Sequence, residues 1–383
     1  MAKVKFGEVI REAKEKVDRS NNPYEFYVAG DHMDTEDLLI RRKGRFATDD
    51  VGPAFIRVFH EGQVLYGSRR TYLKKIAVAD FDGVTANTTF VLETKDENVL
   101  RQRLIPFIMY TEKFTEWSVK KSKGSTNPYV LFSDLADYEF DLPSMGKQDE
   151  LVELLWSMVE AKEAYQELLR QTDELVKARF IEMFGDPETV IKTAKHTVAD
   201  VADVQVGLVI KPTRFYSDNG TGTPAFRSLN VGPMRVIDSD WVYFTDKGMQ
   251  ENIRTVAHTG DVLVVRSGYP GTSCVVTPEF DGRNVVDLLI AHPKTNLVLP
   301  EFLCAYTNFP HGKIQIENMQ RGVAQKHFNV AFYNRMKIVV PTLEKQQEFI
   351  RFLYQSDKSK LELEQAMKAL KAVCDKIISE NLS

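Results

Sequence analysis

The chain is 383 residues long, with 43% hydrophobic and 27% charged residues, a balance typical of folded globular proteins. This length predicts about two to three domains. No apolar run approaches the roughly 18 residues of a membrane span, and the first residues lack the apolar core of a signal peptide. These features exclude a mainly disordered chain, and we expect a cytoplasmic protein without membrane contact.

Charge and cysteine content exclude further classes of protein. The net charge of −4 gives no overall electrostatic signature of nucleic-acid binding, so such binding would depend on local basic clusters. The three cysteines, Cys274, Cys304 and Cys374, are far apart in the sequence. Their odd number and wide spacing predict neither a disulfide framework nor a zinc site, and they fit a reducing compartment.

The sequence repeats itself at an offset of about 198 residues. Glycine, proline and glutamine landmarks coincide at this shift: Gly62-Gln-Val-Leu with Gly260-Asp-Val-Leu, Gly124 with Gly322, Pro143 with Pro341, and Lys147-Gln148 with Lys345-Gln346. Phe81-Asp82-Gly83 meets Phe280-Asp281-Gly282 after one inserted residue. Pairwise identity is low. The pattern therefore predicts one architecture used twice.

In chain order, we expect four segments. Residues 1–143 contain short β-branched and aromatic runs such as Phe26-Tyr-Val-Ala and Phe90-Val-Leu, bounded by turn signals, which predict a mixed α+β domain. Residues 144–187 follow as a first helix and linker. Residues 188–341 form a second α+β domain, and residues 342–383 form a second helix.

The helices are expected over 147–184 and 345–382, because these stretches contain almost no Gly or Pro. Each follows a proline and then Ser144 or Thr342, residue types that favour helix N-caps. Apolar residues recur in heptads, which favours an antiparallel coiled coil between two tandem domains. The predicted seam comprises Leu151, Leu154, Met158, Ala161, Tyr165, Leu168 and Leu175 with Phe349, Phe352, Leu363, Ala366, Leu370, Val373 and Ile377. Two unrelated amphipathic helices, each packed on its own domain, are the alternative.

A search for catalytic motifs finds none that is specific. Signatures of a P-loop, a serine nucleophile elbow, a zinc protease and a CxxC pair are all missing from the sequence. Asp82, Glu93 and Lys95 form a loose nuclease-like pattern, and Asn21-Asn22-Pro23-Tyr24 imitates part of a methyltransferase motif. We predict no catalytic and no metal-binding residue. A nuclease or methyltransferase with its own active site, or a protein scaffold that binds no DNA, are the alternatives.

Local basic clusters in the first domain favour DNA binding. Arginine presents a fork of donors to guanine or phosphate, lysine a point charge to phosphate, and tyrosine a ring that stacks or meets a sugar. One cluster follows the strand Val64-Leu-Tyr, and a second is a basic and small-polar loop. The predicted contacts are Arg69, Arg70, Tyr72 and Lys74, then Lys120, Lys121, Lys123, Ser125 and Thr126. Arg41-Arg42-Lys43-Gly44-Arg45 is a weaker candidate.

The same two places in the second domain are again basic or polar. This agreement between the repeats favours a shared function over two sets of unrelated surface loops. The predicted contacts of the second domain are Arg266, Ser267, Tyr269, Arg321, Gln325 and Lys326.

The whole chain resembles the specificity subunit of type I restriction–modification systems. The run Gly62-Gln-Val-Leu-Tyr-Gly-Ser-Arg-Arg looks like the middle of a target recognition domain, and so does Gly124-Ser-Thr leading to Phe140-Asp-Leu-Pro143. The helix start at Pro341-Thr-Leu-Glu-Lys-Gln346 and the helix end at Arg179-Phe-Ile-Glu-Met-Phe-Gly-Asp-Pro187 are similar to the family's helices and linker. The first helix start lacks the usual Glu, and the second domain lacks the Arg-Arg-x-Tyr form.

The resemblance implies a non-catalytic subunit in which two target recognition domains each read half of a bipartite site in double-stranded DNA. The helices would space the domains and dock two adenine methyltransferase subunits. Motor–nuclease subunits would add cleavage. No cofactor is then expected in this chain, whereas S-adenosylmethionine, ATP and Mg would serve the partner subunits. Residues 144–187 carry 10 acidic against 5 basic residues, so we expect partner docking at Glu160, Glu163 and Glu167.

Overall fold

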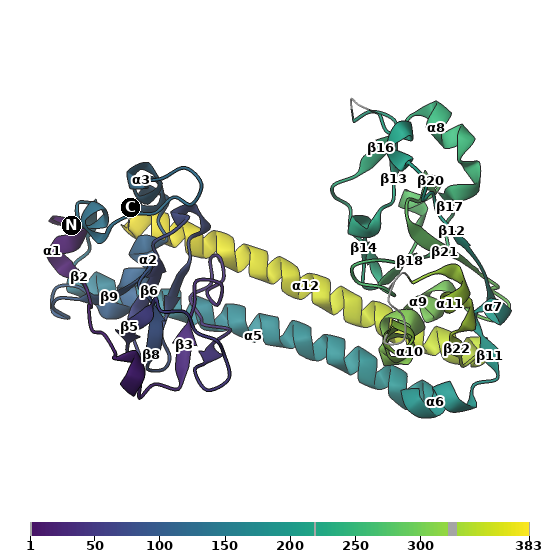
Figure 1. The fold of residues 1–383 in the computed structure, drawn as a ribbon, viewed down its shortest axis with the longest axis horizontal. Coiled ribbons are helices and arrows are strands. Elements are labelled where there is room, and N and C mark those ends of the chain that lie inside the picture. Colours follow the sequence, from purple (N-terminus) through teal and green to yellow (C-terminus); the bar gives the residue numbers. More distant parts are fainter. Residues whose placement is uncertain (1, 218–219, 321–327, 383) are drawn as a thin grey trace. The chain divides into compact units, whose positions relative to one another are not determined.

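The structure is a computed structural model that describes residues 2–217, 220–320 and 328–382. The chain divides into two compact units: Met1–Glu167 with Leu363–Ser383, and Leu168–Glu362. Each unit holds one strand-rich domain and part of each of two long helices, α5 (Met145–Phe184) and α12 (Leu343–Leu382) (Figure 1). Among the described residues, no helix combines the length and apolarity needed to cross a membrane.

The first unit is built on two four-stranded sheets. One is antiparallel throughout, with the strand order β2 (Ile10–Glu12), β9 (Thr89–Thr94), β6 (Val64–Gly67), β7 (Ile76–Val78). The other contains one parallel pair, β3 with β8, in the order β4 (Gly44–Arg45), β3 (Phe26–Val28), β8 (Gly83–Ala86), β5 (Phe55–Phe59). A further antiparallel pair, β1 (Ala2–Lys5) with β10 (Glu139–Leu142), joins the two ends of this domain.

Short helices complete the first unit. They are α1 (Phe6–Val9), α2 (Ile105–Met109), α3 (Glu112–Lys121) and α4 (Phe132–Ala136), with 3-10 turns η1 (Arg19–Asn21), η2 (Thr71–Leu73) and η3 (Gln102–Leu104). Phe6, Tyr66, Phe107 and Phe114 are buried in one core that also receives residues from α5 and α12. Parts of both long helices therefore share this core with the first domain, while Val28, Phe59 and Leu65 belong to a second, separate cluster.

The second unit repeats the antiparallel sheet and differs around it. The sheet has the order β12 (Ala202–Val206), β21 (Leu288–Pro293), β18 (Val262–Val265), β19 (Ser273–Val275). The two-stranded pairs are β11 (His196–Thr197) with β22 (Lys337–Ile338), β13 (Thr223–Ala225) with β16 (Val242–Phe244), β14 (Val231–Gly232) with β15 (Arg235–Val236), and β17 (Val256–Ala257) with β20 (Arg283–Asn284).

Short helices complete the second unit. They are α6 (Pro187–Thr193), α7 (Val198–Val201), α8 (Asp246–Glu251), α9 (Pro300–Asn308), α10 (Pro310–Gln320) and α11 (Val330–Arg335). The 3-10 turns are η4 (Pro212–Phe215), η5 (Ser228–Asn230), η6 (Ile253–Thr255) and η7 (Pro278–Phe280). The sheet, α9 and parts of α5 and α12 contribute to one core.

Backbone hydrogen bonds confirm the predicted repeat. The amide of Phe6 donates to the carbonyl of Tyr138 (2.7 Å), and the amide of Val198 donates to that of Met336 (2.9 Å). Each bond joins the start of a strand-rich domain to the segment just before its last strand. The two domains thus share a framework of connections despite their low sequence identity.

The two long helices run antiparallel, as predicted. In the first unit, Leu151 and Leu155 near the start of α5 share a core with Ile378 near the end of α12. In the second unit, Phe180 near the end of α5 shares a core with Phe349 near the start of α12. Both expected helices are confirmed, although each begins two residues before its expected start, and the α+β class with tandem domains is confirmed.

The predicted heptad seam is wrong at several positions. Leu154, Leu168 and Leu175 on α5 and Val373 on α12 are exposed. Leu151 is buried as predicted, but Leu155 and Trp156, which the predicted seam did not include, are buried beside it. The physical reason is that each helix end packs against a strand-rich core as well as the other helix, so burial there follows the domain surface more than a two-helix seam.

A buried glutamine anchors the start of each long helix to its domain. The Nε2 of Gln148 donates to the carbonyls of Val99 (2.9 Å) and Pro143 (3.0 Å), while its Oε1 accepts from the amide of Arg101 (3.0 Å). The Nε2 of Gln346 donates to the carbonyls of Leu297 and Pro341 (both 2.9 Å), and its Oε1 accepts from the amide of Leu299 (2.8 Å). Every partner is displaced by the same 198 residues, so this contact explains why the Pro and Gln landmarks coincide.

We expect Gln148→Leu and Gln346→Leu each to lower the free energy of unfolding by about 2–4 kcal/mol. Leucine fills a similar volume but leaves two carbonyls and one amide without their partner, and each unsatisfied buried group costs roughly 1–3 kcal/mol. Denaturant unfolding of the full chain measures the change. Gln347→Leu, at an exposed neighbour on the same helix, is the matched control, and an equal effect in control and test variants would contradict the anchoring role.

Candidate nucleic-acid interface

The structure brings the two predicted clusters of the first domain together. The loop between β6 and β7 carries Arg69 and Arg70, and a second loop follows α3. The amide of Arg70 donates to the carbonyl of Pro128 (2.7 Å), and the amide of Val130 donates to that of Ser68 (2.9 Å). These bonds hold the arginine-bearing loop against the lysine-bearing loop, so both clusters lie on one surface.

The β6–β7 loop has a tightly specified backbone. It contains η2, and the residues on either side of this turn, Arg70 and Lys74, lie in the left-handed region with φ of 50° and 46°. Thr71 is buried, and its hydroxyl lies 3.4 Å from the hydroxyl of Ser122 at the end of α3. Below the loop, burial raises the pKa of Tyr66 to about 12. The loop is thus fixed to α3 through Thr71 and Ser122, and it lies over the buried, neutral side chain of Tyr66.

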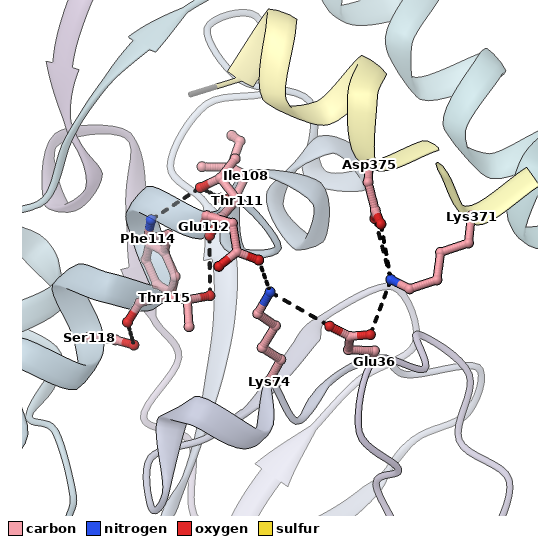
Figure 2. A network of polar contacts seen from close by, with 10 residues as sticks. All are labelled: Glu36, Lys74, Ile108, Thr111, Glu112, Phe114, Thr115, Ser118, Lys371 and Asp375. Carbon is pink, nitrogen blue, oxygen red and sulfur yellow. Dashed lines mark hydrogen bonds and ion pairs between the residues drawn. The ribbon is translucent and has the colours of Figure 1, made fainter. Parts of the chain in front are cut away.

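Lys74 is held in a chain of ion pairs rather than left free (Figure 2). Its ammonium lies 2.6 Å from a carboxylate oxygen of Glu112 and 3.6 Å from one of Glu36, and its side chain is only 13% exposed. The other carboxylate oxygen of Glu36 lies 3.2 Å from Lys371 of α12, which also pairs with Asp375 (3.1 Å). The chain links the loop to α3 and α12 within the first unit.

Two members of this chain of ion pairs, Glu36 and Lys371, are stabilised in their charged forms. Burial acts to raise the pKa of Glu36, but the hydrogen bonds and charges of Lys371 and Lys74 outweigh it and lower that pKa. Burial acts to lower the pKa of Lys371, but the bonds to Asp375 and Glu36 outweigh it and raise that pKa. The positive charge of Lys74 is therefore already balanced by its ion pairs with two carboxylates, and its predicted role in DNA binding stays a prediction.

The remaining cations of the first surface differ in how free they are. Lys123 lies 3.0 Å from Asp134, and Lys121 lies over the ring of Trp117 at 4.8 Å. In the part of the chain that the structure describes, the exposed side chains of Arg69, Arg70 and Lys120 form no ion pair. Ser125 and Thr126 are exposed beside them. Arg69, Arg70 and Lys120 are thus the best placed to meet phosphate or base edges.

The weaker third cluster is used inside the molecule. Arg41 pairs with Asp37 (3.0 Å) and with Glu163 of α5 (2.9 Å). Arg42 pairs with Asp34, and Arg45 pairs with Glu25. These contacts give the cluster a structural role within the first unit.

The second unit places its predicted contacts in the corresponding loop. The amide of Phe328 donates to the carbonyl of Arg266 (3.3 Å), which repeats the bond from Val130 to Ser68 at the same offset of 198 residues. The guanidinium of Arg266 lies 2.6 Å from Asp287 and donates to the carbonyl of Phe328 (3.2 Å), and its side chain is 16% exposed. Ser267 and Tyr269 are exposed. Arg321, Gln325 and Lys326 lie outside the described residues.

The residues that sequence reasoning missed are the counter-charges. Glu36, Glu112 and Asp287 neutralise Lys74 and Arg266. No spacing pattern could reveal them, since each lies far along the chain from the cation it contacts. The Lys371–Asp375 pair does carry a sequence signal, because it joins positions i and i+4 of one helix.

The other chemistry-bearing residues have structural partners. Asp82 accepts from the amide of Glu61 (2.9 Å), Glu93 pairs with Arg11 (2.7 Å), and Lys95 donates to the carbonyl of Gly7. Burial raises the pKa of Cys304 to about 12. Over the described ranges, no group of three or more His, Cys, Asp or Glu residues is arranged to hold a metal ion.

The acidic residues expected to dock a partner lie on α5. Glu160 is exposed. Glu163 accepts from Arg41 at 2.9 Å, and Glu167 also has an interaction partner within the chain. The acidic surplus of this helix is therefore partly balanced inside the molecule.

Comparisons with known proteins relate this architecture to one family. A 94-residue stretch is 28% identical to the type I restriction enzyme EcoDI specificity subunit from Escherichia coli, covering 24% of this chain and 20% of that subunit. No family model matches the chain. The match thus spans about a fifth of the length of that relative.

Two solved structures have the same fold. One comes from a study of complex assembly and conformational transition of the type I R-M system, with a TM-score of 0.63 at 18% identity, covering 100% of this chain and 97% of that chain. The other is the type I restriction-modification system S subunit from M. genitalium, with a TM-score of 0.55 at 13% identity, covering 100% and 95%. The expected resemblance to type I specificity subunits is confirmed, and the shared feature is the fold.

We expect Lys74→Met to loosen the loop between β6 and β7. The change removes the cation between Glu36 and Glu112, and a hydrogen bond to a charged group contributes about 1.5–3 kcal/mol. Hydrogen exchange of the Leu73 and Lys74 backbone amides, which close η2, should accelerate about tenfold or more. Lys113→Met, at the exposed neighbour of Glu112, should leave exchange unchanged, and equal exchange in the two variants would contradict the anchoring role.

Proposed function

We propose that this chain, which has the fold of type I specificity subunits, is the DNA sequence-recognition subunit of a type I restriction–modification complex. Each strand-rich domain would read one half of a bipartite site in double-stranded DNA. The fold, the sequence match to a specificity subunit and the basic surface of the first unit all support this function.

The observation that carries the proposal is the duplicated loop pair. In each unit a hairpin loop, β6–β7 in the first and β18–β19 in the second, is joined to a second loop by the same backbone hydrogen bond. This bond runs from Val130 to Ser68 in the first unit and from Phe328 to Arg266 in the second. In the first unit this surface presents Arg69 and Arg70 from the β6–β7 loop and Lys120 from the last turn of α3, not from the loop after it as the sequence suggested. A duplicated binding surface fits a target that itself has two halves, because each copy can read its own segment of DNA.

The chemistry of the complex would come from its partners. In this proposal two adenine methyltransferase subunits bring S-adenosylmethionine, and motor–nuclease subunits bring ATP and Mg. This chain contributes sequence recognition and a docking surface, and it acts in the cytoplasm together with those subunits. Its own residues would select where methylation or cleavage takes place without entering the reaction.

The docking surface on α5 is better described as apolar than as acidic. Glu163 and Glu167 have partners within the chain, whereas Leu168 and Leu175 are large apolar side chains exposed on the same helix. Exposed apolar side chains in a helical row are a common basis for helix-mediated association. We therefore propose that a methyltransferase subunit contacts α5 at these two leucines, which lie in the part of the helix that belongs to the second unit.

The experiment that tests the function exchanges one domain. Co-expression with the cognate methyltransferase subunit, followed by sequencing of methylated adenines, gives the recognised motif. Replacing residues 1–143 with the corresponding domain of another specificity subunit should change one half of this motif and leave the other half intact. The reason is that each domain has its own core and its own loop pair. Absence of sequence-specific methylation, or a change in both halves, would contradict separate recognition.

A second prediction concerns docking. The double variant Leu168→Ser and Leu175→Ser should weaken binding of the methyltransferase subunit about tenfold or more, because burial of a leucine contributes roughly 1.5–3 kcal/mol. Light scattering of the purified mixture should show free subunits at both low and high salt. Ala178→Ser, at an exposed position of the same helix, is the control. A loss seen only with Glu160→Lys, and only at low salt, would return the contact to the acidic residues.

A further inference from the structure

The hairpin loops of the two units present a tyrosine at corresponding positions. The first loop is closed by the bond from the amide of Gly67 to the carbonyl of Lys75 (3.0 Å), and the second by the bond from Val265 to Thr272 (2.8 Å). Tyr72 lies three residues before Lys75, and Tyr269 lies three residues before Thr272. The second loop is one residue shorter, which is why a fixed offset of 198 residues does not align the two rings.

The second loop holds its tyrosine on a rigid backbone. Inside the loop, Tyr269 donates to the carbonyl of Ser267 (3.1 Å), Thr272 donates to that of Tyr269 (3.2 Å), and Gly271 donates to that of Val265 (3.0 Å). Gly271 has a φ of +80°, and a Cβ there would lie 2.2 Å from the Cδ1 of Ile316. The loop is therefore closed by its own bonds and packed closely against α10.

Two further contacts fasten this loop from outside. The ammonium of Lys313 donates to the carbonyl of Pro270 (3.3 Å), and the guanidinium of Arg266 pairs with Asp287 (2.6 Å). Arg266 thus uses its charge to hold the base of the loop. Its neighbour at the tip, Tyr269, is left to face solvent.

The first loop is fastened by different residues to the same effect. Leu73 donates to the carbonyl of Arg70 (2.9 Å) and Lys74 donates to that of Thr71 (3.0 Å), while the ammonium of Lys74 lies between Glu36 and Glu112 (Figure 2). The ion pairs of Lys74 hold this loop as the ion pair between Arg266 and Asp287 holds the loop of the second unit. In each loop the ion pairs of one cation hold the loop in place.

On these fixed backbones the two tyrosine side chains are open to solvent, Tyr72 by 55% and Tyr269 by 84%. Within the described parts of the chain, neither hydroxyl forms a hydrogen bond to protein, whereas the equally exposed Tyr354 of α12 donates to Glu301 (2.8 Å). A large ring on a pre-ordered loop loses little entropy when it binds, which is how tyrosine serves recognition surfaces. The exposed rings therefore lie ready for a flat or apolar partner.

We propose that Tyr72 and Tyr269 are equivalent aromatic contacts, one for each half of the duplex, which pack their rings against a base or deoxyribose. This inference rests on the proposed function and assigns different DNA contacts to the cations and to the tyrosines. Arg69, Arg70 and Lys120 supply the contact with phosphate, which weakens as salt rises because counterions are released. The neutral phenol rings supply an apolar contact with a base edge or deoxyribose in the groove, and salt does not screen this contact.

The test measures DNA affinity of the assembled methyltransferase complex across a series of salt concentrations, using duplexes that carry the methylated motif. Tyr72→Ala and Tyr269→Ala should each lower affinity on the order of tenfold at every salt concentration, with the slope of log K against log salt unchanged. Tyr72→Phe and Tyr269→Phe should keep most of the affinity, because the ring remains. Arg69→Ala should instead reduce the slope by about 0.9. Tyr354→Ala, with the same 55% exposure as Tyr72, should change neither the DNA affinity nor the salt slope.

Duplexes with one half of the motif scrambled assign each ring to its half. The effect of Tyr72→Ala should vanish when the half read by the first domain is scrambled and persist when the other half is scrambled, with the reverse for Tyr269→Ala. Unchanged affinity in both alanine variants, or a reduced salt slope, would overturn the aromatic assignment. A wild-type complex without preference for its motif would instead reject the proposed function, so the two failures are distinct.

Discussion

Both units depend on the hydrogen bonds of one buried glutamine near the start of each long helix. Gln148 and Gln346 are buried, and each satisfies two carbonyls and one amide from the junction between a strand-rich domain and a long helix. Buried backbone groups left without partners are costly. The helix must therefore begin at the same point relative to each domain, and the shared core of domain and helices follows from this junction.

The two hairpin loops, β6–β7 and β18–β19, show how a shared framework can carry different side chains. In each loop one cation is committed to carboxylates, Lys74 to Glu36 and Glu112, and Arg266 to Asp287. Such partly buried pairs fix a conformation, and a cation bound in this way is less available to a phosphate. The groups that remain free at the loop tips are those that a target can use.

Helices and repeat were predictable from the sequence because their signals are local. Both helices are 40 residues long and almost free of Gly and Pro, and the landmarks of the repeat mark backbone contacts that both units make. The seam was not predictable: Leu168 and Leu175 fit a heptad yet are exposed, because domain cores as well as the other helix decide which face of α5 is buried. The basic clusters were visible as composition, but the ion pair between Lys74 and Glu112 joins residues 38 positions apart and needs the fold to be seen.

We propose that the paired hairpin loops face DNA in both units. Hydroxyl-radical footprinting of the assembled complex, with and without a duplex that carries its motif, tests this claim through the exposed tyrosine rings. We expect oxidation of Tyr72 and Tyr269 to fall when the duplex is bound, while that of Tyr354 on α12 stays constant. Oxidation of Tyr72 and Tyr269 that is unchanged by bound DNA would contradict it.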